Sequence, residues 1–452
     1  MRVAVVGGGI GGLTVAWELS RRRPDAEVVV LEAAERVGGK LRVADLAGQP
    51  VDVGAEAMLV RRPEGAELVA ELGLELVHPL TTSASIRAAG SLHPVPTGTV
   101  MGVPSGPETV ADVLDAETLA RVAAEPSDPP LPPLTDDVAV GQVVADRVGR
   151  QVVDRLVEPL LAGVYAGRPA RLSLRAAVPQ LWVHLRDGGS LVDAARRSLP
   201  AATTGPRPPV FGSVRGGLGR LPGELVRQGR FAVRTGVTVR ELRRTAQGFD
   251  LVTGSVPGAV VEHVDAVVVA VPPPAAARLL ATVAPQAAAA LAAVELASVA
   301  VVSAAFRTAD VDLPAGSGLL VAPDEGLAVK GVTITSQKWG VDADGLTLLR
   351  TSLGRAGETR TLQRSDDDLV ALALADLQTL YGRRFAPLDT RVTRWGGGLP
   401  QYDVGHTERV AAVRAAVAAV PGLAVAGAAY DGVGVPAVIG SARAAAHRVI
   451  EA

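Results

Sequence analysis

Residues 1–40 read MRVAVVGGGIGGLTVAWELSRRRPDAEVVVLEAAERVGGK, and this stretch decides the fold. Val3 to Val6 form a short apolar run that predicts a buried strand. The glycines of 7–12 predict a turn, residues 13–22 have the composition of a helix, and a second apolar run follows at 28–31. Strand, glycine turn, helix and strand in this order predict a βαβ unit.

Gly7, Gly9 and Gly12 occupy the three glycine positions of a G-x-G-x-x-G pattern. The first permits a tight turn, the second lets a pyrophosphate approach the backbone, and the third lets the helix pack on the strand. The N-terminus of the helix offers free N–H groups to phosphates. Glu32 lies 20 residues past Gly12, where a carboxylate accepts ribose hydroxyls. Three glycines alone would fit a structural turn in a chain with 50 of them, but this context favours a dinucleotide site.

Composition excludes several classes of protein. The 452 residues suffice for two or more domains, and 45 Lys and Arg nearly balance 47 Asp and Glu, so we expect neither a nucleic-acid partner nor more than peripheral membrane contact. The absence of cysteine excludes disulfides and thiolate chemistry. Met1 and Arg2 lead directly into the first strand, without a signal peptide, so we expect a cytoplasmic protein. No metal is expected, because the histidines show no ligand spacing: His78, His93, His184, His263, His406 and His447.

The distribution of apolar runs predicts an α/β protein with a discontinuous Rossmann-like domain. We expect residues 1–80, 210–272 and 390–452 to form this nucleotide-binding domain. Residues 81–103 and 273–389 are expected to form a mixed α+β substrate-binding domain. Residues 104–209 are expected to form a helical subdomain with helices at 108–124 and 138–160, a proline-rich linker at 125–133 that cannot be helical, and a loop at 201–209.

A second glycine loop, Glu35 to Lys40, follows Glu32 at once. Nicotinamide enzymes have no general need for such a loop. In flavoproteins of the amine-oxidase type, an Arg-x-Gly-Gly turn like that of Arg36 to Gly39 wraps the diphosphate from the other side. This resemblance implies that the dinucleotide is FAD.

Further patches are more specific than the glycines. Residues 158–167 read EPLLAGVYAG, 336–339 SQKW, 352–355 SLGR, 399–406 LPQYDVGH and 427–436 GAAYDGVGVP. Together with the glycine loops, they resemble the soluble bacterial coproporphyrinogen III oxidase group of the protoporphyrinogen oxidase family, within the FAD-dependent amine-oxidase superfamily. The patches run from residue 3 to residue 450, so the resemblance covers essentially the whole chain.

The resemblance implies a set of FAD contacts where the motifs match. These are the pyrophosphate turn, the ribose carboxylate with its neighbour, the second glycine loop, the flavin-side loop, an adenine contact, and the turn that opens the last helix: Gly7, Gly8, Gly9, Ile10, Gly11, Gly12, Glu32, Ala33, Arg36, Gly39, Lys40, Gly54, Ala55, Glu56, Ala57, Val239, Trp395, Ala428, Val433, Gly434 and Val435. Two departures from the family pattern stand out. Ala437 and Val438 replace a polar pair, and glycines 396–398 follow Trp395, where we expect a looser loop.

The resemblance also implies the reaction, the oxidation of coproporphyrinogen III to coproporphyrin III in haem biosynthesis. Six electrons would leave in three steps, with hydride passing to flavin N5 and three O2 becoming three H2O2. No catalytic residue is assigned, because this chemistry belongs chiefly to the cofactor. A tetracarboxylate substrate needs cations, and Arg61, Arg62 and, more weakly, Lys338 are candidate anchors. A solvated arginine pair is an equally good reading of residues 61–62.

Other readings stay open at this point. One is protoporphyrinogen IX as substrate, and another is an amine oxidase or carotenoid desaturase of the same superfamily. A third is a relative that keeps the fold and has lost the flavin, like the prenyl-binding dissociation inhibitors. The intact glycine loops and Glu32 argue against that third reading. The residues do not decide the electron acceptor or a transient contact with a ferrochelatase.

Overall fold

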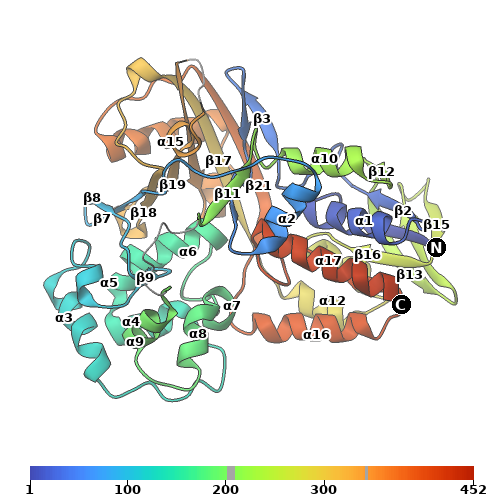
Figure 1. Cartoon of the computed structure of the whole chain (residues 1–452), viewed down its shortest axis with the longest axis horizontal. Coiled ribbons are helices and arrows are strands. Elements are labelled where there is room, and N and C mark those ends of the chain that lie inside the picture. Colours follow the sequence, from blue (N-terminus) through green and yellow to red (C-terminus); the bar gives the residue numbers. More distant parts are fainter. Residues whose placement is uncertain (201–208, 342–344, 452) are drawn as a thin grey trace.

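A computed structural model describes residues 1–200, 209–341 and 345–451 of the chain, and residues 201–208 of the expected loop lie outside these ranges. A parallel five-stranded sheet with the order β12-β2-β1-β16-β22 lies in one half of the molecule (Figure 1). Val5 of the central strand β1 (Arg2–Val6) pairs with Val30 on one side and Val268 on the other. Since β1 is buried on both faces, it reads as an uninterrupted apolar run. The βαβ prediction is confirmed.

Helices cover one face of this sheet, and a mixed layer covers the other. The first face packs against the first and last helices of the chain, and the second packs against an antiparallel meander and three helices. This part comprises β1, α1 (Ile10–Arg22), β2 (Glu27–Leu31), α2 (Pro63–Glu71), α10 (Arg220–Gln228), β12 (Ala232–Arg234), β13 (Val239–Thr245), β14 (Gly248–Thr253), β15 (Val260–Val264), β16 (Ala266–Val269), α11 (Pro273–Leu280), α12 (Pro285–Ala292), α16 (His406–Ala418), β22 (Leu423–Val425) and α17 (Val435–Glu451).

A seven-stranded sheet with the order β21-β17-β20-β19-β18-β7-β8 forms the second part, with α15 on one face (Figure 1). The members of this part are β7 (Ser85–Ala88), β8 (Ser91–Pro94), β17 (Leu296–Arg307), η4 (Thr308–Asp310), β18 (Gly318–Val321), η5 (Pro323–Glu325), β19 (Val329–Ile334), α13 (Thr335–Trp339), β20 (Leu346–Leu353), α14 (Thr359–Leu362), α15 (Asp366–Tyr381) and β21 (Asp389–Pro400). Short strands link the two sheets: β3 (Val43–Leu46), β4 (Gln49–Asp52), β5 (Met58–Leu59), β6 (Leu76–Val77) and β11 (Phe211–Val214).

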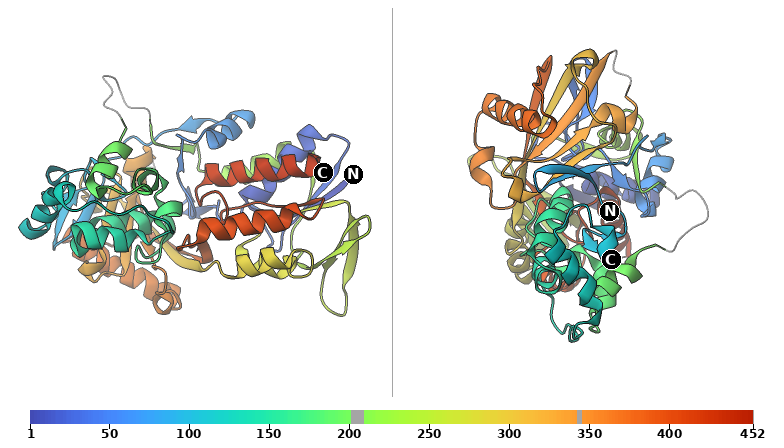
Figure 2. Two further views of the ribbon diagram at one scale, coloured as in Figure 1. Left: turned by 90° about the horizontal axis from the view of Figure 1, so that it is seen from below. Right: turned by 90° about the vertical axis from the view of Figure 1, so that its left-hand side faces the viewer.

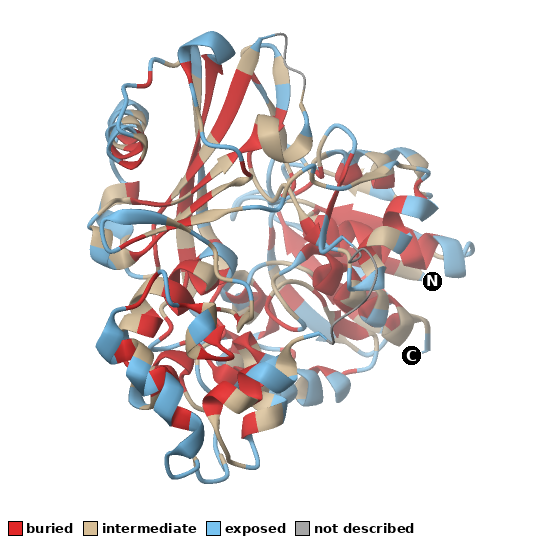
Figure 3. Ribbon diagram, turned by 60° about the vertical axis from the view of Figure 1, so that its left-hand side comes forward, coloured by how far each residue is buried: buried red, intermediate tan, exposed pale blue. Residues whose placement is uncertain are grey.

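The third part is helical and lies below the seven-stranded sheet in Figure 1. It contains β9 (Thr99–Val100), β10 (Val103–Pro104), η1 (Pro107–Thr109), α3 (Ala116–Ala124), η2 (Glu125–Ser127), α4 (Val140–Val148), α5 (Arg150–Val152), the π-helical turn η3 (Val153–Val157), α6 (Glu158–Tyr165), α7 (Leu174–Ala177), α8 (Pro179–Leu185) and α9 (Leu191–Ser198). Helix α6 contacts β18 and β19, so it lies where this part meets the sheet. Figure 3 shows buried segments within each of the three parts.

Three predicted elements are wrong in extent. The helix expected at 108–124 begins only at Ala116, because Asp115 caps it by accepting a hydrogen bond from Thr118 N. The helix expected at 138–160 is interrupted at Gly149, whose φ of +100° ends α4. The linker expected at 125–133 starts with the single 3-10 turn η2, because Pro126 is tolerated in a first turn.

The packing moves two of the expected domain boundaries. Residues 273–292 form α11 and α12, which pack on the five-stranded sheet rather than in the substrate-binding domain. Residues 390–400 belong to β21 of the seven-stranded sheet, and glycines 396–398 continue that strand instead of forming a looser loop. Gly397 adopts φ +56° close to the register shift between β21 and β17, which lets the strand bend without ending.

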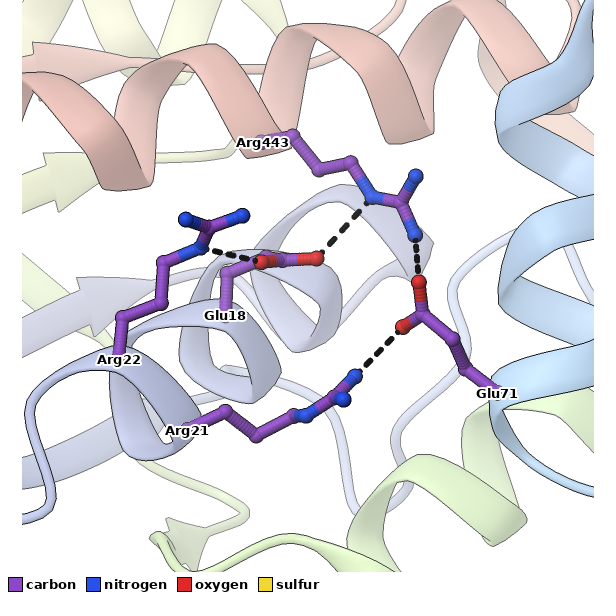
Figure 4. Close-up of a pocket in the computed structure, with 5 residues that line it drawn as sticks. All are labelled: Glu18, Arg21, Arg22, Glu71 and Arg443. Atoms are coloured by element: carbon purple, nitrogen blue, oxygen red, sulfur yellow. Dashed lines mark hydrogen bonds and ion pairs between the residues drawn. The ribbon is translucent and has the colours of Figure 1, made fainter.

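Ion pairs join the first and last helices of the nucleotide-binding part. Arg443 of α17 pairs with Glu18 of α1 at 3.0 Å and with Glu71 of α2 at 2.6 Å (Figure 4). Glu71 also accepts from Arg21, and Arg443 reaches Glu67 at 2.5 Å. The N- and C-termini lie at the same end of the molecule, as two perpendicular views show (Figures 1 and 2).

Candidate flavin site

The turn after β1 is shaped to admit a phosphate. A Cβ built on Gly12 would lie 1.9 Å from Gly7 O, so the strand and the helix close up only with glycine at position 12. A Cβ on Gly9 would meet nothing within 4 Å, which shows open space directly over the turn. Helix α1 begins at Ile10 with no acidic residue in its first turn. Its N–H groups and its positive end are thus available to an anion in that space.

Glu32 stands at the end of β2 beside this turn. Its Oε2 accepts from Gly8 N at 2.6 Å and its Oε1 accepts from Ala34 N at 2.8 Å. These two bonds hold the carboxylate next to the opening, where a ribose would lie. Backbone bonds from Glu32 N to Arg234 O and from Val237 N to Glu32 O lead the chain from β12 toward the buried Val239. The predicted ribose and adenine residues are therefore neighbours.

The second glycine loop packs on the first. Gly38 N donates to Gly8 O at 2.7 Å, and a Cβ on Gly39 would be 3.3 Å from Gly9 Cα. The Arg36 guanidinium donates to the carbonyl oxygens of its own loop at Val37 and Gly39. Lys40 has an accessible side chain, yet the surrounding protein desolvates its ammonium and lowers its pKa. A cation of this kind suits the wall of a hollow that binds an anion.

The flavin-side loop is anchored to the second glycine loop and to β21. A Cβ on Gly54 would lie 1.9 Å from Lys40 O, and Ala55 N donates to that same oxygen at 3.2 Å. The Trp395 indole donates to Val53 O at 2.9 Å, which places its ring against Gly54. Residues 54–57 are partly accessible, so this loop also borders open space.

Glu56 is the centre of a buried ionic triad. Its Oε1 accepts from Lys338 Nζ at 2.6 Å and its Oε2 accepts from Arg350 at 2.7 Å, while Arg350 also donates to Gly54 O at 2.7 Å. Burial alone would raise the pKa of Glu56, but the two cations, Arg350 first, hold it below its ordinary value. Glu56 is thus ionised, and the triad ties the flavin-side loop to β20 and α13.

The turn before α17 completes the ring of loops. A Cβ on Gly11 would be 3.7 Å from Gly427 Cα, so this turn abuts the start of α1. Tyr402 Oη donates to Ala428 O at 2.7 Å, which fixes that backbone. Residues 433 and 434 retain accessible surface directly before α17, and the first turn of that helix contains no acidic residue. A second positive helix end therefore faces the same opening.

The loops at 7–12, 35–40, 54–57 and 427–434 thus lie around the open space over Gly9, here called the hollow, and the donor set fits a dinucleotide. Open space lies over Gly9, two helix N-termini and Lys40 offer positive charge, and Glu32 offers an acceptor at one end. Of the predicted contacts, Ala33 and Ala57 are the least defined, since the structure gives them only a place in these loops. The assignment of individual residues to FAD stays a prediction.

The candidate substrate cations occupy different settings. Lys338 is committed to Glu56 and its side chain is only 18% exposed. Arg62 donates to Asp431 O and pairs with Glu64 at 3.0 Å, so it stands beside the turn before α17. Arg61 is exposed, and no carboxylate of the described residues pairs with it. The arginines therefore lie at the edge of the hollow, and Lys338 lies in its wall.

Two groups were missed at the sequence level. Arg350 sits in the middle of a strand, and only the register of β20 brings it to Glu56, so no local signal marks it. His406 stacks on Tyr402 with ring centroids 3.8 Å apart, and Tyr165 lies 5.5 Å from Tyr402 on the other side. Tyr165, Tyr402 and His406 belong to the sequence patches at 158–167 and 399–406, and this membership is the signal that could have identified them.

The buried His406 of this stack makes the folding stability depend on pH. Burial, and secondarily Arg409, lowers the pKa of His406 from 6.5 to about 4. The unfolded chain therefore takes up a proton at a higher pH than the folded chain does, and stability falls as the pH drops from 6.5 toward 4. At pH 5 we expect this group to cost about 2 kcal/mol, at 1.36 kcal/mol per pH unit.

Urea unfolding at pH 7.5 and pH 5 tests this, with His406→Phe as the variant that keeps a stacked ring. The difference between the two pH values should shrink by about 2 kcal/mol in the variant. The partly exposed His184 gives the matched control, since His184→Phe should leave the difference unchanged. Equal pH dependence in the wild type and His406→Phe would contradict the expectation.

Comparison with known proteins agrees with the geometry. The family model "Flavin containing amine oxidoreductase" matches residues 10–450. The chain belongs to this family. It is 44% identical to the coproporphyrinogen III oxidase of Mycobacterium bovis over 99% of this chain and 97% of that protein. It is 32% identical to the enzyme of that name from Bacillus subtilis over 98% and 96%. It therefore falls in the coproporphyrinogen III oxidase group within the family.

The fold is also that of a solved structure. A crystal structure from Exiguobacterium sp. 255-15 superimposes with a TM-score of 0.87 at 31% identity, covering 100% of this chain and 99% of the other. Membership in the family establishes FAD as the cofactor and a discontinuous Rossmann-like FAD-binding domain as the fold. No helix of the described residues is both long enough and apolar enough to cross a membrane.

Proposed function

We propose that this chain oxidises coproporphyrinogen III to coproporphyrin III in haem biosynthesis. Six electrons and six protons leave the macrocycle in three two-electron steps, and three O2 become three H2O2. The observation that carries the proposal is the similarity to coproporphyrinogen III oxidases along nearly the whole chain, together with an intact dinucleotide hollow. A cytoplasmic location and a transient contact with a ferrochelatase stay predictions.

The chain's own contribution would be to hold the ring and to exclude water. Trp395, Val301 and Ser352 lie on the same face of the seven-stranded sheet, because the pairing registers of β17 with β20 and β21 direct their side chains to the same side. Helix α6 contacts this sheet, and its Gly163 and Val164 remain accessible where the helical part meets the sheet. Small and apolar side chains on both sides suit a flat, largely apolar macrocycle.

When bound, FAD supplies a two-electron acceptor for each step. The residues around it would fix its orientation. Trp395 holds Val53 O, Tyr402 holds Ala428 O, and the triad of Glu56 holds the loop at 54–57. The N-terminus of α17 would stabilise negative charge that develops on the nearest ring atoms.

Anaerobic addition of coproporphyrinogen III to the yellow protein tests the proposal directly. Bleaching of the flavin, then recovery in air with three H2O2 per coproporphyrin formed, is the expected result. Protoporphyrinogen IX under the same conditions is the comparison substrate. Faster turnover of protoporphyrinogen IX, or no bleaching by either, would overturn the proposal.

Arg62 is a predicted anchor for a propionate at the mouth of the hollow. In Arg62→Ala we expect KM for coproporphyrinogen III to rise about 10-fold, since a charge-assisted hydrogen bond contributes about 1.5 kcal/mol or more. Turnover at saturation should change little. Arg215→Ala removes a more exposed arginine that pairs with Glu75, and it should leave KM unchanged. An unchanged KM in Arg62→Ala would remove Arg62 from the site.

A further inference from the structure

Lys330 is a buried cation inside the seven-stranded sheet. It is one of three lysines in the chain, and only 6% of its surface is exposed. On β19, Val329 pairs with Leu353 and Gly331 pairs with Ser352, so Lys330 is the extra residue of a β-bulge. A bulge redirects a side chain that regular alternation would place elsewhere.

The charged groups near Lys330 pair with one another rather than with Lys330. Glu158 of α6 pairs with Arg355 at 3.2 Å, and Glu358 accepts from Arg168 at 2.7 Å and from Arg355 N at 3.2 Å. Arg355 also donates to Val321 O. Within the residues that the structure describes, Lys330 has no carboxylate within 4.0 Å, although the Arg355 guanidinium is close enough to disfavour its charged form. Lys330 is therefore a third cation beside two carboxylates that already pair with arginines.

Glycines with accessible surface lie beside this cation, on β19 and on the facing helix α6. A Cβ on Gly331 would meet Leu319 O at 3.4 Å and Leu320 Cδ2 at 3.5 Å, and a Cβ on Gly163 of α6 would meet only Leu320 Cδ2 at 3.9 Å. The two glycines thus approach Leu320 from opposite sides, and both keep accessible surface. Val164, the next residue of α6, is 42% exposed in this central position.

A buried, unpaired ammonium is costly unless an anion completes it. We propose that Lys330 binds a carboxylate of the substrate where α6 faces β18 and β19 of the seven-stranded sheet. This inference rests on the proposed function, because a porphyrinogen with four propionates supplies the anion. Lys330 lies on β19, two strands from β17 and three from β21, which carries Trp395. At about 4.8 Å between strands, a porphyrin-sized ring spans that width.

The position also explains why the cation is a lysine in a chain that otherwise uses arginine. A guanidinium carries a fork of five donors that needs several fixed partners, whereas an ammonium is a compact charge on a flexible stem. Desolvation and Arg355 lower the pKa of Lys330 to about 7, so Lys330 can lose its proton near neutral pH when no anion is bound. An entering carboxylate then draws a proton onto Nζ.

Binding of the product to the holoenzyme tests the proposal without turnover. Flavin fluorescence or porphyrin fluorescence quenching gives Kd for coproporphyrin III and for its tetramethyl ester, which has the same ring and no charge. In Lys330→Met we expect Kd for the acid to rise at least 10-fold and Kd for the ester to stay within 2-fold. Lys330→Arg should recover part of the loss. Arg307→Met, on the exposed end of β17 in the same sheet, is the matched control and should change neither constant.

The dependence on pH separates binding from a structural role. The charged groups that face Lys330 are Arg355 and Glu358 after β20, Glu158 on α6 and Arg168 after α6. Since the protonated amine binds the carboxylate, affinity should be constant below pH 6 and fall up to 10-fold per pH unit above 7. Lys330→Met should lack this fall. Equal slopes in the wild type and the variant would overturn the proposal.

A second variant keeps the test decisive if Lys330→Met loses flavin or melts early. Gly163→Leu adds a side chain to the facing helix α6 without touching the ion pairs near Lys330, and leucine is a better helix former than glycine. We expect unchanged melting and flavin content, with at least 10-fold weaker binding of both acid and ester. Unchanged binding would show that the porphyrin does not bind between Gly163 of α6 and the seven-stranded sheet. If the wild type neither binds coproporphyrin nor oxidises coproporphyrinogen, the proposed function fails; if it does both and the variants match it, only the role of Lys330 fails.

Discussion

Gly9→Asp is expected to give a folded, colourless protein. A side chain at this position enters open space, since a Cβ on Gly9 has no neighbour within 4 Å. The new carboxylate would lie where the diphosphate of FAD is expected, and like charges 4 Å apart cost about 4 kcal/mol at an effective dielectric of 20. FAD affinity should therefore fall about 1,000-fold, while the unfolding of the flavin-free protein should match that of the wild type.

The visible flavin absorbance per polypeptide after purification checks this, with urea unfolding of both apoproteins beside it. Gly9→Ala is the matched control, because it adds the same Cβ without charge and should remain yellow. Gly12→Ala should instead fail to fold, since its Cβ would lie 1.9 Å from Gly7 O. A Gly9→Asp protein with full flavin content would place the diphosphate elsewhere.

Glu56→Ala is expected to cause a large loss of stability. It leaves Lys338 and Arg350 buried without their shared carboxylate, with side chains only 18% and 12% exposed. Breaking one partner of a buried ionic group costs about 3–5 kcal/mol. The flavin-side loop at 54–57 should loosen as well, because Arg350 also holds Gly54 O.

The free energy of unfolding of the apoprotein in urea measures the first effect, and the FAD dissociation constant measures the second. Glu75→Ala removes an exposed carboxylate that pairs only with Arg215, and it should cause no measurable loss. Lys338→Met/Glu56→Met replaces two charges with apolar groups of similar size and should recover part of the stability. A Glu56→Ala protein as stable as the wild type would mean that water solvates Lys338 and Arg350 in the variant.

The sequence predicted those parts of the fold that local pattern controls. The apolar run of β1, the glycine turn and Glu32 lie within one βαβ unit, so their spacing alone specified a dinucleotide site. The boundaries at 273 and 390 failed for the opposite reason. Helices α11 and α12 and strand β21 have the composition of many domains, and only packing decides which sheet they join.

The candidate site could likewise be predicted only where local sequence pattern controls it. Glycine loops are predictable because no other residue fits them, as the 1.9 Å approach at Gly54 shows. Arg350 and Lys330 are ordinary residues in strands, and their roles depend on the register of β20 and on a bulge in β19. Pairing registers between distant strands leave no mark in a single sequence.

The strand order of the parallel sheet has a consequence for biosynthesis. Its edge strand β22 and the helix that Arg443 ties to Glu18 come from the last thirty residues of the chain, while β1 is made first. A nascent chain therefore exposes one side of β16 and one face of α1 until β22 and α17 have been made. The binding ring for the flavin is therefore complete only once the turn before α17 has left the ribosome, so we expect full flavin binding late in the synthesis of this chain.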